Sequence, residues 1–463
     1  MNKKYLPIVI VIIVLLLLSL GYYYFYEKNN SNTNDIEASS TIDYKDSNDV
    51  DFSNYQVYTV DLNNIDSKYT ITSAGVYHFT GNLSGYIYVN TTENVEIILD
   101  NVTIKNESGP CIYIESAKNT YISLVGTNNL SDGSTYSNFT DIDGAIYSKD
   151  DLFITGDRTL NLTANYLDGI VSKDDLVIES GTINITSKDD GIRGKDSVVI
   201  KTGTINIESQ GDGIKSTNDE DSSKGYILIQ NGNITIKSTL DAIEATSNLE
   251  IDNGTINLTT GGGSTIKSTS SSWGNWNTTS TNNESAKGLK AGNSILIKNI
   301  TLNENTSDDA IHSNNIIEID TGNIVISSGD DGIHADSKIT INDGTINIKE
   351  SYEGIESNYI IINNGTINVV STDDGINVNG GSDNSSQGRM GSNTLSSDTS
   401  NLCLEINGGS LYVNSSGDGL DSNGSIKMTS GTVYVDGPTD DGNGAIDYNN
   451  TFGNHTVGAM GLF

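Results

Sequence analysis

The sequence contains little proline, cysteine or tryptophan. Its 463 residues include 3 prolines, 2 cysteines and 2 tryptophans, and aromatic residues make up 7%. The helix formers Ala, Leu, Glu, Lys and Arg are sparse after residue 30, whereas β-branched Ile, Val and Thr alternate with Asn and Ser. This composition favours strands. We therefore expect an all-β chain with almost no helix beyond its first 26 residues.

The two cysteines exclude a disulfide framework. Cys111 and Cys403 both lie in short apolar runs. In the repeat described below, about eleven coils of ~4.8 Å separate them, a distance far beyond the reach of a disulfide. We expect two buried free thiols, which indicate neither an oxidising nor a reducing compartment.

Basic residues are scarce as well. The chain has 25 Lys and Arg against 60 Asp and Glu, which gives a formal net charge of −35. Such a surface repels phosphate backbones and makes nucleic acid an unsuitable partner. It suits cations, although acidity also keeps an extracellular protein soluble. No Ser-His-Asp, P-loop or nucleotide motif occurs in a usable context.

One long apolar run is present, and it lies at the N-terminus. Residues 5–26 are long enough to cross a bilayer as a helix and end in an aromatic cluster. We predict a single-pass anchor there, with residues 1–4 in the cytoplasm and a polar, flexible tether over residues 27–55. A signal peptide cleaved near Ser19 or Gly21 is the alternative. The rest of the chain would then lie at the extracellular face of the membrane.

A repeat with a period near 22 residues dominates the chain from residue 140 onward. Its marker is an acidic residue, a small residue and an aliphatic residue. The acidic members are Asp168, Asp190, Asp212, Asp241, Asp309, Asp331, Glu353, Asp374 and Asp418.

Each period also contains two short alternating runs, such as Val198-Val199-Ile200 and Thr204-Ile205-Asn206-Ile207. Three short strands in 22 residues cannot bury their dry face alone, but stacked turns can. We predict a right-handed, single-stranded parallel β-helix, and rank a propeller well below it because that fold needs about twice the period. Residues 56–140 would form a cap and irregular first coils, and residues 141–457 the regular coils. Insertions lie near residues 261–285 and 380–400, and residues 458–463 form the C-terminal end.

Several motifs resemble a family of surface-displayed parallel β-helix proteins that bind carbohydrate. They include Asp330-Asp331-Gly332-Ile333-His334-Ala335, Tyr352-Glu353-Gly354-Ile355-Glu356-Ser357 and Ala286-Lys287-Gly288-Leu289-Lys290-Ala291. The likeness runs from about residue 60 to about residue 450. That family is similar in fold to pectate lyases, and the resemblance implies calcium binding and attachment to acidic sugars or cell-wall polysaccharide without cleavage. One departure is the early end of this chain, which predicts a short C-terminal cap.

The marker carboxylates form the strongest candidate site. Asp-Gly is good turn chemistry, but stacking like charges at coil spacing costs about 1 kcal/mol per pair in water and more in protein. A hard cation with oxygen ligands would explain the choice of Asp over Asn, and calcium tolerates irregular geometry better than magnesium. The predicted ligands are Asp168, Asp189, Asp190, Asp212, Asp241, Asp308, Asp309, Asp330, Asp331, Glu353, Asp373, Asp374 and Asp418.

Sugar contacts are predicted for four residues outside that column. Trp273 and Trp276 lie in a Gly, Ser, Thr and Asn insertion, where indole faces are available for stacking on sugar rings. Lys287 and Lys290 are the basic residues next to this insertion, and we assign them to carbohydrate binding as well.

Two further sets of residues have plainer interpretations. His312 and His334 lie one period apart, and we interpret them as a polar ladder at the surface, since a transition-metal site would need a third ligand that the sequence does not identify. Arg193 is the one candidate base for a calcium-dependent lyase, although an arginine there can simply pair with its acidic neighbours.

The leading hypothesis is a monomeric, non-catalytic, calcium-dependent protein of the cell surface that binds polysaccharide. The acidic character of the sugar follows from the resemblance alone. The alternatives are a calcium-dependent polysaccharide lyase of the pectate type and a structural adhesin or envelope spacer.

Overall fold

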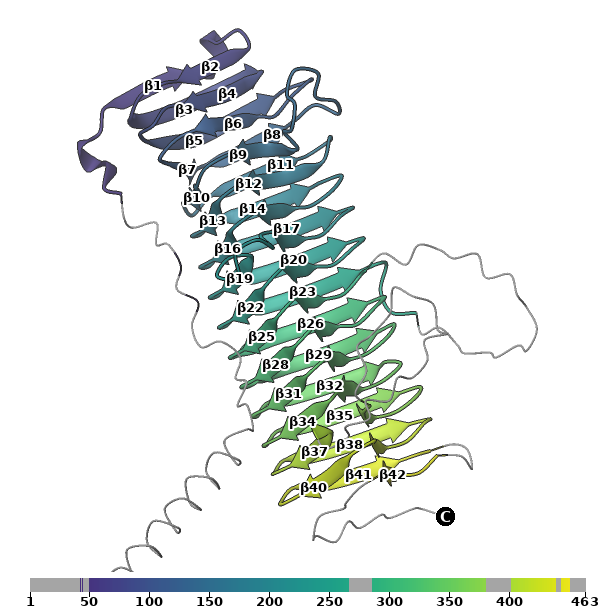
Figure 1. Cartoon of the computed structure of the whole chain (residues 1–463). Coiled ribbons are helices and arrows are strands. Elements are labelled where there is room, and N and C mark those ends of the chain that lie inside the picture. The colour runs from purple at the N-terminus through teal and green to yellow at the C-terminus, as the bar shows by residue number, and fades with distance from the viewer. Residues whose placement is uncertain are drawn as a thin grey trace, which may run out of the picture. The chain divides into compact units, whose positions relative to one another are not determined.

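A computed structural model of the chain describes residues 42, 44, 50–265, 285–379, 401–438 and 443–449. In that part every strand pairing is parallel, and equivalent strands of successive coils stack in register (Figure 1). The predicted parallel β-helix is confirmed. Two short 3₁₀ helices, η2 (Phe52–Asn54) and η3 (Leu62–Asn64), precede or interrupt the first strands.

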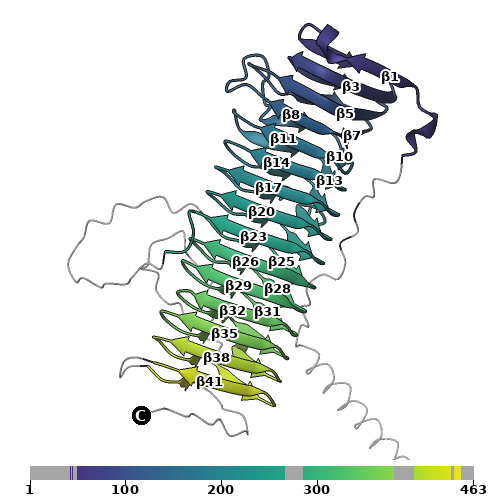
Figure 2. The same cartoon turned by 180° about the vertical axis from the view of Figure 1, so that it is seen from behind.

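Each regular coil contributes three strands, which stack into three faces of a rod that Figure 2 shows from behind. The first face, which we call the marker sheet, contains the short strands that begin at the marker triplets. It has 15 strands: β2 (Lys68–Ile71), β4 (Tyr86–Asn90), β6 (Ile112–Ser116), β9 (Gly144–Ser148), β12 (Asp168–Ser172), β15 (Ile192–Gly194), β18 (Ile214–Ser216), β21 (Ile243–Ala245), β24 (Leu289–Ala291), β27 (Ile311–Ser313), β30 (Ile333–Ala335), β33 (Ile355–Ser357), β36 (Ile376–Val378), β39 (Leu420–Ser422) and β42 (Ile446–Tyr448).

The other two faces share one sheet of 27 strands. They begin together in β1 (Val57–Asp61), β3 (Gly75–Ser84) and β5 (Asn94–Lys105). The second face then continues as β7 (Asn119–Val125), β10 (Leu152–Thr155), β13 (Asp175–Ile178), β16 (Ser197–Ile200), β19 (Tyr226–Ile229), β22 (Asn248–Ile251), β25 (Ser294–Ile297), β28 (Ile316–Ile319), β31 (Lys338–Ile341), β34 (Tyr359–Ile362), β37 (Cys403–Ile406) and β40 (Ser425–Met428).

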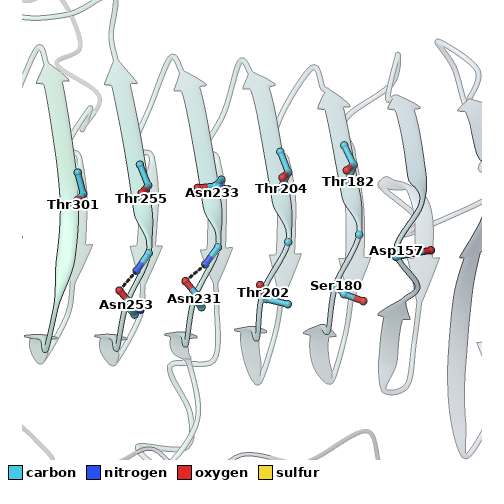
Figure 3. A pocket seen from close by; sticks show the side chains of 14 residues that line it. Asp157, Ser180, Thr182, Thr202, Thr204, Asn231, Asn233, Asn253, Thr255 and Thr301 are labelled. Carbon is cyan, nitrogen blue, oxygen red and sulfur yellow. Dashed lines mark hydrogen bonds between the residues drawn. The ribbon is translucent and has the colours of Figure 1, made fainter.

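The third face contains the alternating Thr-Ile-Asn strands. They are β8 (Thr127–Ser131), β11 (Thr159–Thr163), β14 (Thr182–Thr186), β17 (Thr204–Ser209), β20 (Asn233–Ser238), β23 (Thr255–Thr260), β26 (Ile300–Thr306), β29 (Gly322–Ser328), β32 (Thr345–Glu350), β35 (Thr366–Ser371), β38 (Ser410–Ser415) and β41 (Thr432–Asp436). The outward threonines and asparagines of neighbouring strands lie side by side in rows along the rod (Figure 3).

The core is a set of aliphatic stacks inside the three faces. On the third face, for example, Ile183, Ile205 and Ile234 follow one another in register and are completely buried. Glycine is required at the bend between the second and third faces, where Gly203 (φ 130°) and Gly344 (φ 113°) have backbone angles that other residues rarely adopt. Cys111 and Cys403 are buried free thiols, as predicted.

Glu304 interrupts one of these aliphatic stacks. Its side chain points inward between Leu258 and Ile326, is 4% exposed, and finds no hydrogen-bond partner among the described residues. Burial raises the pKa of this carboxyl well above its ordinary value, so it is neutral in the folded chain. A neutral but unpaired carboxyl still destabilises the core.

The end of the predicted tether packs on the rod. Ile42, Tyr44, Val50 and Phe52 contact an apolar stripe on the outer side of the second face, formed by Tyr121, Phe153, Val177, Val199 and Leu228. The backbone N–H of Ile42 also donates to Glu250 Oε2 at 3.0 Å. The prediction of a free tether does not hold for these residues, because the outward positions of five successive strands are apolar and need a cover.

The predicted cytoplasmic end, membrane anchor and most of the tether lie outside the described residues, as do the greater part of both insertions and the C-terminal end. Among the residues that are described, none belongs to a helix long and apolar enough to span a bilayer. The coils continue across both insertions, since β21 pairs with β24 and β36 pairs with β39.

Glu304→Leu should stabilise the protein, because it replaces an unpaired carboxyl with the residue type that the neighbouring coil already carries. We expect a gain of about 2 kcal/mol at pH 8, which for a chain of this size raises the Tm by about 2 °C. The folded pKa is raised, so the parent has its full stability below pH 4.5 and loses it as the pH rises through the raised pKa. The Tm difference, measured by calorimetry, should therefore grow from pH 4.5 to pH 8, and an equal difference at both values would contradict the buried-acid interpretation.

Candidate functional site

The marker residues form one buried column at the start of the marker strands. Successive members of this acidic column are backbone neighbours; the N–H of Gly191, for example, donates to Asp212 O and that of Gly213 to Asp241 O. Several of the side chains are almost completely buried: Asp168, Asp241 and Asp309 are only 1–2% exposed. Carboxylates of the column therefore lie close to one another at the start of the marker strands.

One oxygen of each aspartate binds the backbone of the next coil. The N–H of Asp190 donates to Asp168 Oδ1 at 3.0 Å and that of Asp212 to Asp190 Oδ1 at 2.9 Å. The same bond recurs between Asp331 and Asp309 Oδ1 at 3.0 Å, and between Asp418 and Asp374 Oδ1 at 2.6 Å. This bond fixes the coil-to-coil step, but asparagine could make it equally well.

The second carboxylate oxygen explains why the column contains aspartate and not asparagine. It faces a row of residues that lie three positions after the column residues and stack in register with one another; the partner comes from the same coil for Asp212 and from the next coil for Asp241. This partner row contains Arg193, Lys215, Glu244, Lys290, His312, His334, Glu356, Asn377, Asp421 and Asp447.

Basic members of the partner row neutralise the N-terminal part of the column, from Asp168 to Asp309, which we call its upper part. Arg193 pairs with Asp168 Oδ2 and with Asp143 Oδ2, the latter at 2.6 Å, and Lys215 Nζ lies 2.6 Å from Asp212 Oδ2. Lys290 Nζ lies 2.8 Å from Asp241 Oδ2. These carboxylates therefore have cations supplied by the chain itself.

The column itself contains one cation, Lys287, at the position that other coils fill with Asp or Glu. Lys287 Nζ lies 3.2 Å from Asp308 Oδ1 and 2.5 Å from Asp309 Oδ2, and its side chain is 5% exposed. Its backbone N–H donates to Asp241 Oδ1 at 2.7 Å, as a column aspartate would. Lys287 is thus an internal counter-ion, and the sugar contact predicted for it stays a prediction that this burial argues against.

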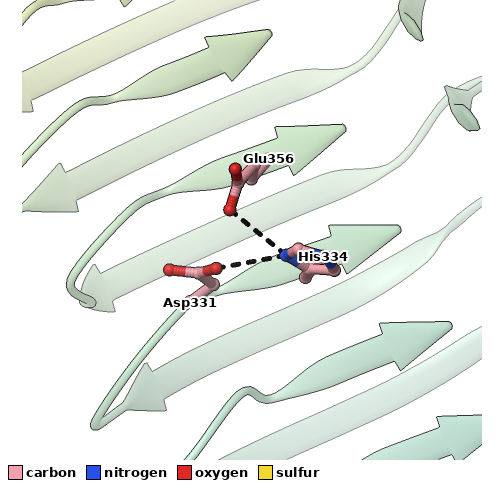
Figure 4. Close-up of side chains that lie close together, drawn as sticks. All are labelled: Asp331, His334 and Glu356. Atoms are coloured by element: carbon pink, nitrogen blue, oxygen red, sulfur yellow. Dashed lines mark hydrogen bonds and ion pairs between the residues drawn. The ribbon is translucent and has the colours of Figure 1, made fainter. Parts of the chain in front are cut away.

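The two histidines of the partner row also pair with column carboxylates. They stack with ring centroids 5.0 Å apart, and His312 Nδ1 lies 2.9 Å from Asp309 Oδ2. His334 Nδ1 lies 3.3 Å from Asp331 Oδ2 and 3.2 Å from Glu356 Oε2 (Figure 4). Both rings are buried, 5% and 1% exposed, rather than forming a ladder at the surface.

The surroundings of His334 favour its charged form. Burial opposes its charge, but hydrogen bonds to Asp331, Asp336 and Glu356 raise the pKa of His334 well above its ordinary value. Burial raises the pKa of many carboxyls in the column. Where a carboxyl faces two basic groups, their charges have the opposite effect and lower its pKa. Lys290 and Lys215 outweigh the burial of Glu244 and lower its pKa to about 2.

The C-terminal part of the column differs, because its partner row is acidic. After His334, toward the C-terminus, the row continues as Glu356, Asn377, Asp421 and Asp447. Burial, followed by the charges of Asp373, Asp421 and Asp418, raises the pKa of Asp374 to about 7.

Neighbouring carboxyls at this end are affected in the same way. Burial together with Asp418 and Asp447 raises the pKa of Asp421 to about 6. Burial, with Glu356 and Asp331, raises that of Glu353 well above its usual range. Burial also raises the pKa of Asp168 and of Asp212 to about 7, so it is the acidic partner row, and not the size of the shift, that distinguishes this end.

The acidic residues that immediately precede column residues in the sequence also lie close to the column. Asp189 groups with Asp168 and Asp190, and Asp308 and Asp330 group with Asp309, with one carboxylate oxygen of each residue within 4.8 Å of the others. Asp373 accepts a hydrogen bond from the Tyr352 hydroxyl. Trp273 and Trp276 lie outside the described residues.

A second acidic cluster was missed at the sequence level. Asp151, Asp174 and Asp175 bring carboxylate oxygens within 4.8 Å of one another at the turn between the marker sheet and the second face. The available signal was the recurrence of Ser-Lys-Asp-Asp-Leu at residues 148–152 and 172–176. The partner row was also missed, although its basic residues occur three positions after the marker residue in several coils.

Lys287→Met should destabilise the protein by about 3–5 kcal/mol, because it leaves Asp308 and Asp309 buried with one counter-ion fewer. Lys427→Met is the matched control: that side chain is 55% exposed and pairs with Glu405 at 2.9 Å, so its loss should cost less than about 1 kcal/mol. Thermal unfolding of the two variants, each with a chelator present, measures the difference. Equal Tm losses would show that burial of the Lys287 pair has no special role.

Comparison with known proteins identifies the family of this chain. A family model described as carbohydrate-binding domain-containing protein matches residues 65–332 and 330–375. A carbohydrate-binding domain-containing protein from Acetivibrio thermocellus is 35% identical over 124 residues, which are 25% of this chain and 43% of that protein. The chain thus spans less than half the length of this relative.

Among solved structures, a polysaccharide lyase-like protein from C. thermocellum, studied as a gadolinium derivative, is 32% identical to this chain. The TM-score is 0.42, and the match covers 44% of this chain and 91% of that one. The family match alone spans more than half of the present sequence and confirms the resemblance found in its motifs. The chain belongs to the family of carbohydrate-binding domain-containing proteins.

Proposed function

We propose that the chain is a non-catalytic, calcium-dependent protein of the cell surface that binds acidic or cell-wall polysaccharide. Membership of a carbohydrate-binding family supports the sugar ligand. The cell-surface location is supported by the apolar run of residues 5–26, and the calcium by the C-terminal part of the acidic column.

The observation that carries the calcium proposal is an unsatisfied oxygen beside uncompensated carboxylates. Asn377 is 1% exposed and donates through Nδ2 to Glu353 Oε2 at 2.6 Å, while its Oδ1 has no hydrogen-bond partner among the described residues. In the partner row it lies between Glu356 and Asp421. Amide and carboxylate oxygens together are a donor set that suits calcium.

The upper part of the column is less suited to calcium, because Arg193, Lys215, Lys287 and Lys290 already occupy the second aspartate oxygens. We therefore narrow the predicted ligands to Glu353, Asp374 and Asp418, with Asn377 and Asp421 added. A cation held there also gives an acidic sugar a positive partner on a chain whose net charge of −35 would otherwise repel it.

The environment of Arg193 supports binding without cleavage. Burial opposes its charge, but the carboxylates of Asp168 and Asp143 outweigh burial and raise the pKa of the guanidinium above its ordinary value. An arginine held in this way cannot accept a proton from a sugar, so it does not supply the base that a lyase requires.

A glycan pull-down with polygalacturonate, with calcium or with a chelator, tests this function. The supernatant is followed by ultraviolet absorbance for unsaturated uronate. Binding that needs calcium and releases no product supports the proposal, whereas release of product identifies a lyase. Neither binding nor product would leave the structural spacer as the better description.

Asp374→Asn should flatten the response of the Tm to calcium. Asparagine keeps the Oδ1 acceptor for the N–H of Asp418 but removes one charge from the cation site. For a site with a dissociation constant of ~0.1 mM, millimolar calcium adds about 1.4 kcal/mol to the parent. Asp212→Asn is the control, because Lys215 already holds Asp212 Oδ2 and its calcium response should match the parent. A calcium response lost in neither or in both variants would contradict a site at the C-terminal end.

Replacing Trp273 and Trp276 together with Ala should weaken polysaccharide binding while leaving the Tm nearly unchanged, because indole faces in a polar insertion stack on sugar rings. Affinity electrophoresis and calorimetry measure the two effects. A large loss of stability with intact binding would mean that the tryptophans serve folding instead.

A further inference from the structure

The third face carries two grooves that the acidic column does not reach. The first, about 510 Å³, runs beside the bend that precedes the face, between the side chains of Ser180, Thr202 and Asn231 and those of Thr182, Thr204 and Asn233 (Figure 3). The second, about 520 Å³, runs along the middle of the same strands past Asn184, Asn206, Thr186 and Thr235. Both cross β14, β17, β20 and β23, so they follow the axis of the rod.

Both grooves carry almost no net charge, although the protein is strongly acidic. Asp157 is the single charged residue lining the first groove. Glu208 and Lys237 line the second, and they are register neighbours of opposite charge. A polyuronate gains no electrostatic attraction here, and a neutral ligand meets no penalty for burying charge.

The second groove contains a ladder of asparagine amides. Asn184 Nδ2 donates to Asn161 Oδ1 at 2.8 Å, and Asn206 Nδ2 donates to Asn184 Oδ1 at 2.8 Å. An amide has two N–H donors and two acceptor lone pairs, so the ladder leaves one donor and one acceptor of Asn184 for a ligand. Because the ladder holds these side chains in place, binding costs little side-chain entropy.

The ladder presents its free hydrogen-bonding groups at the coil spacing of ~4.8 Å. A hydroxyl both donates and accepts, and therefore matches an amide that has one free donor and one free acceptor. A pyranose ring with its linkage is about as long as one coil is thick. The grooves thus suit a hydroxyl-rich polymer that is extended along the rod, with about one sugar per coil.

We infer that the grooves on β14, β17, β20 and β23 bind a neutral polysaccharide without the help of calcium. This inference rests on the proposed carbohydrate binding and adds a second surface with its own class of sugar. The cation site at the C-terminal end of the column serves acidic polymers, and the third face serves neutral ones.

Affinity electrophoresis in gels containing hydroxyethylcellulose, galactomannan or polygalacturonate, each with calcium or EDTA, tests the inference on the full chain. At least one neutral polymer should retard the protein equally with calcium and with EDTA. Asn184→Val together with Asn206→Val should weaken that binding about tenfold or more, since two amides lose their hydrogen bonds. Val325 occupies the same row naturally, so the fold accepts valine there.

The matched control is Asn347→Val together with Asn368→Val, in the same row but outside both grooves. This variant should bind the neutral polymer like the parent, and the Tm values of both variants verify folding. The inference is overturned if no neutral polymer binds, if EDTA abolishes the binding, or if the two variants lose equal affinity. Calcium-dependent retardation by polygalacturonate, intact in both variants, reports separately on the proposed function.

Discussion

In-register stacking of equivalent residues is the constraint on which the rest of this structure depends. A parallel pairing places each residue beside its counterpart one coil away, at ~4.8 Å, and the pairings of the regular coils keep that register. For isoleucine the consequence is favourable, since identical aliphatic side chains form a continuous core. For a charged residue it is costly, because every like charge gains two near neighbours.

The acidic column shows how the chain accommodates that cost. Each aspartate uses one oxygen for the backbone of the next coil, which the fold needs, and directs the other toward the partner row. In the upper coils the partner row is basic except for Glu244, which pairs with Lys215 and Lys290, and Lys287 adds a cation within the column itself. Farther on, the row turns acidic at Glu356 and Asp421 while the column remains acidic. The raised pKa values of Asp374 and Asp421 favour protonation at that end, and the cation that we propose there would neutralise it in the ionised form.

The sequence was sufficient for the architecture because the repeat period and the alternation of apolar and polar residues determine which side of each strand is buried. The positions of the column residues followed for the same reason. The burial of Lys287 was not foreseen, because the residue was considered for its charge and not for its place in the period, one position before a marker glycine. Glu304 was missed because a carboxylate is expected to face solvent, although the alternation of Ile300, Leu302 and Glu304 places it on the apolar side of its strand.

Other features could not be predicted, because they depend on which residues meet across coils or across long separations. The contact of Ile42, Tyr44, Val50 and Phe52 with the second face joins segments that are up to 208 residues apart, and the polar composition around them indicated a tether. The choice among candidate cation ligands likewise depends on side-chain pairs such as Lys215 with Asp212, which a list of acidic residues does not contain.

The same register that makes a column of carboxylates costly makes a row of asparagines favourable. An amide has a donor on one branch and an acceptor on the other, so each asparagine satisfies its neighbours without any counter-ion. A carboxylate has acceptors only and must recruit a cation. One coil geometry therefore produces two surfaces of opposite chemistry, a charged edge that needs cations and a neutral face that does not. Because the two surfaces lie on different faces of the rod, the two kinds of ligand that we propose would not compete for the same side chains.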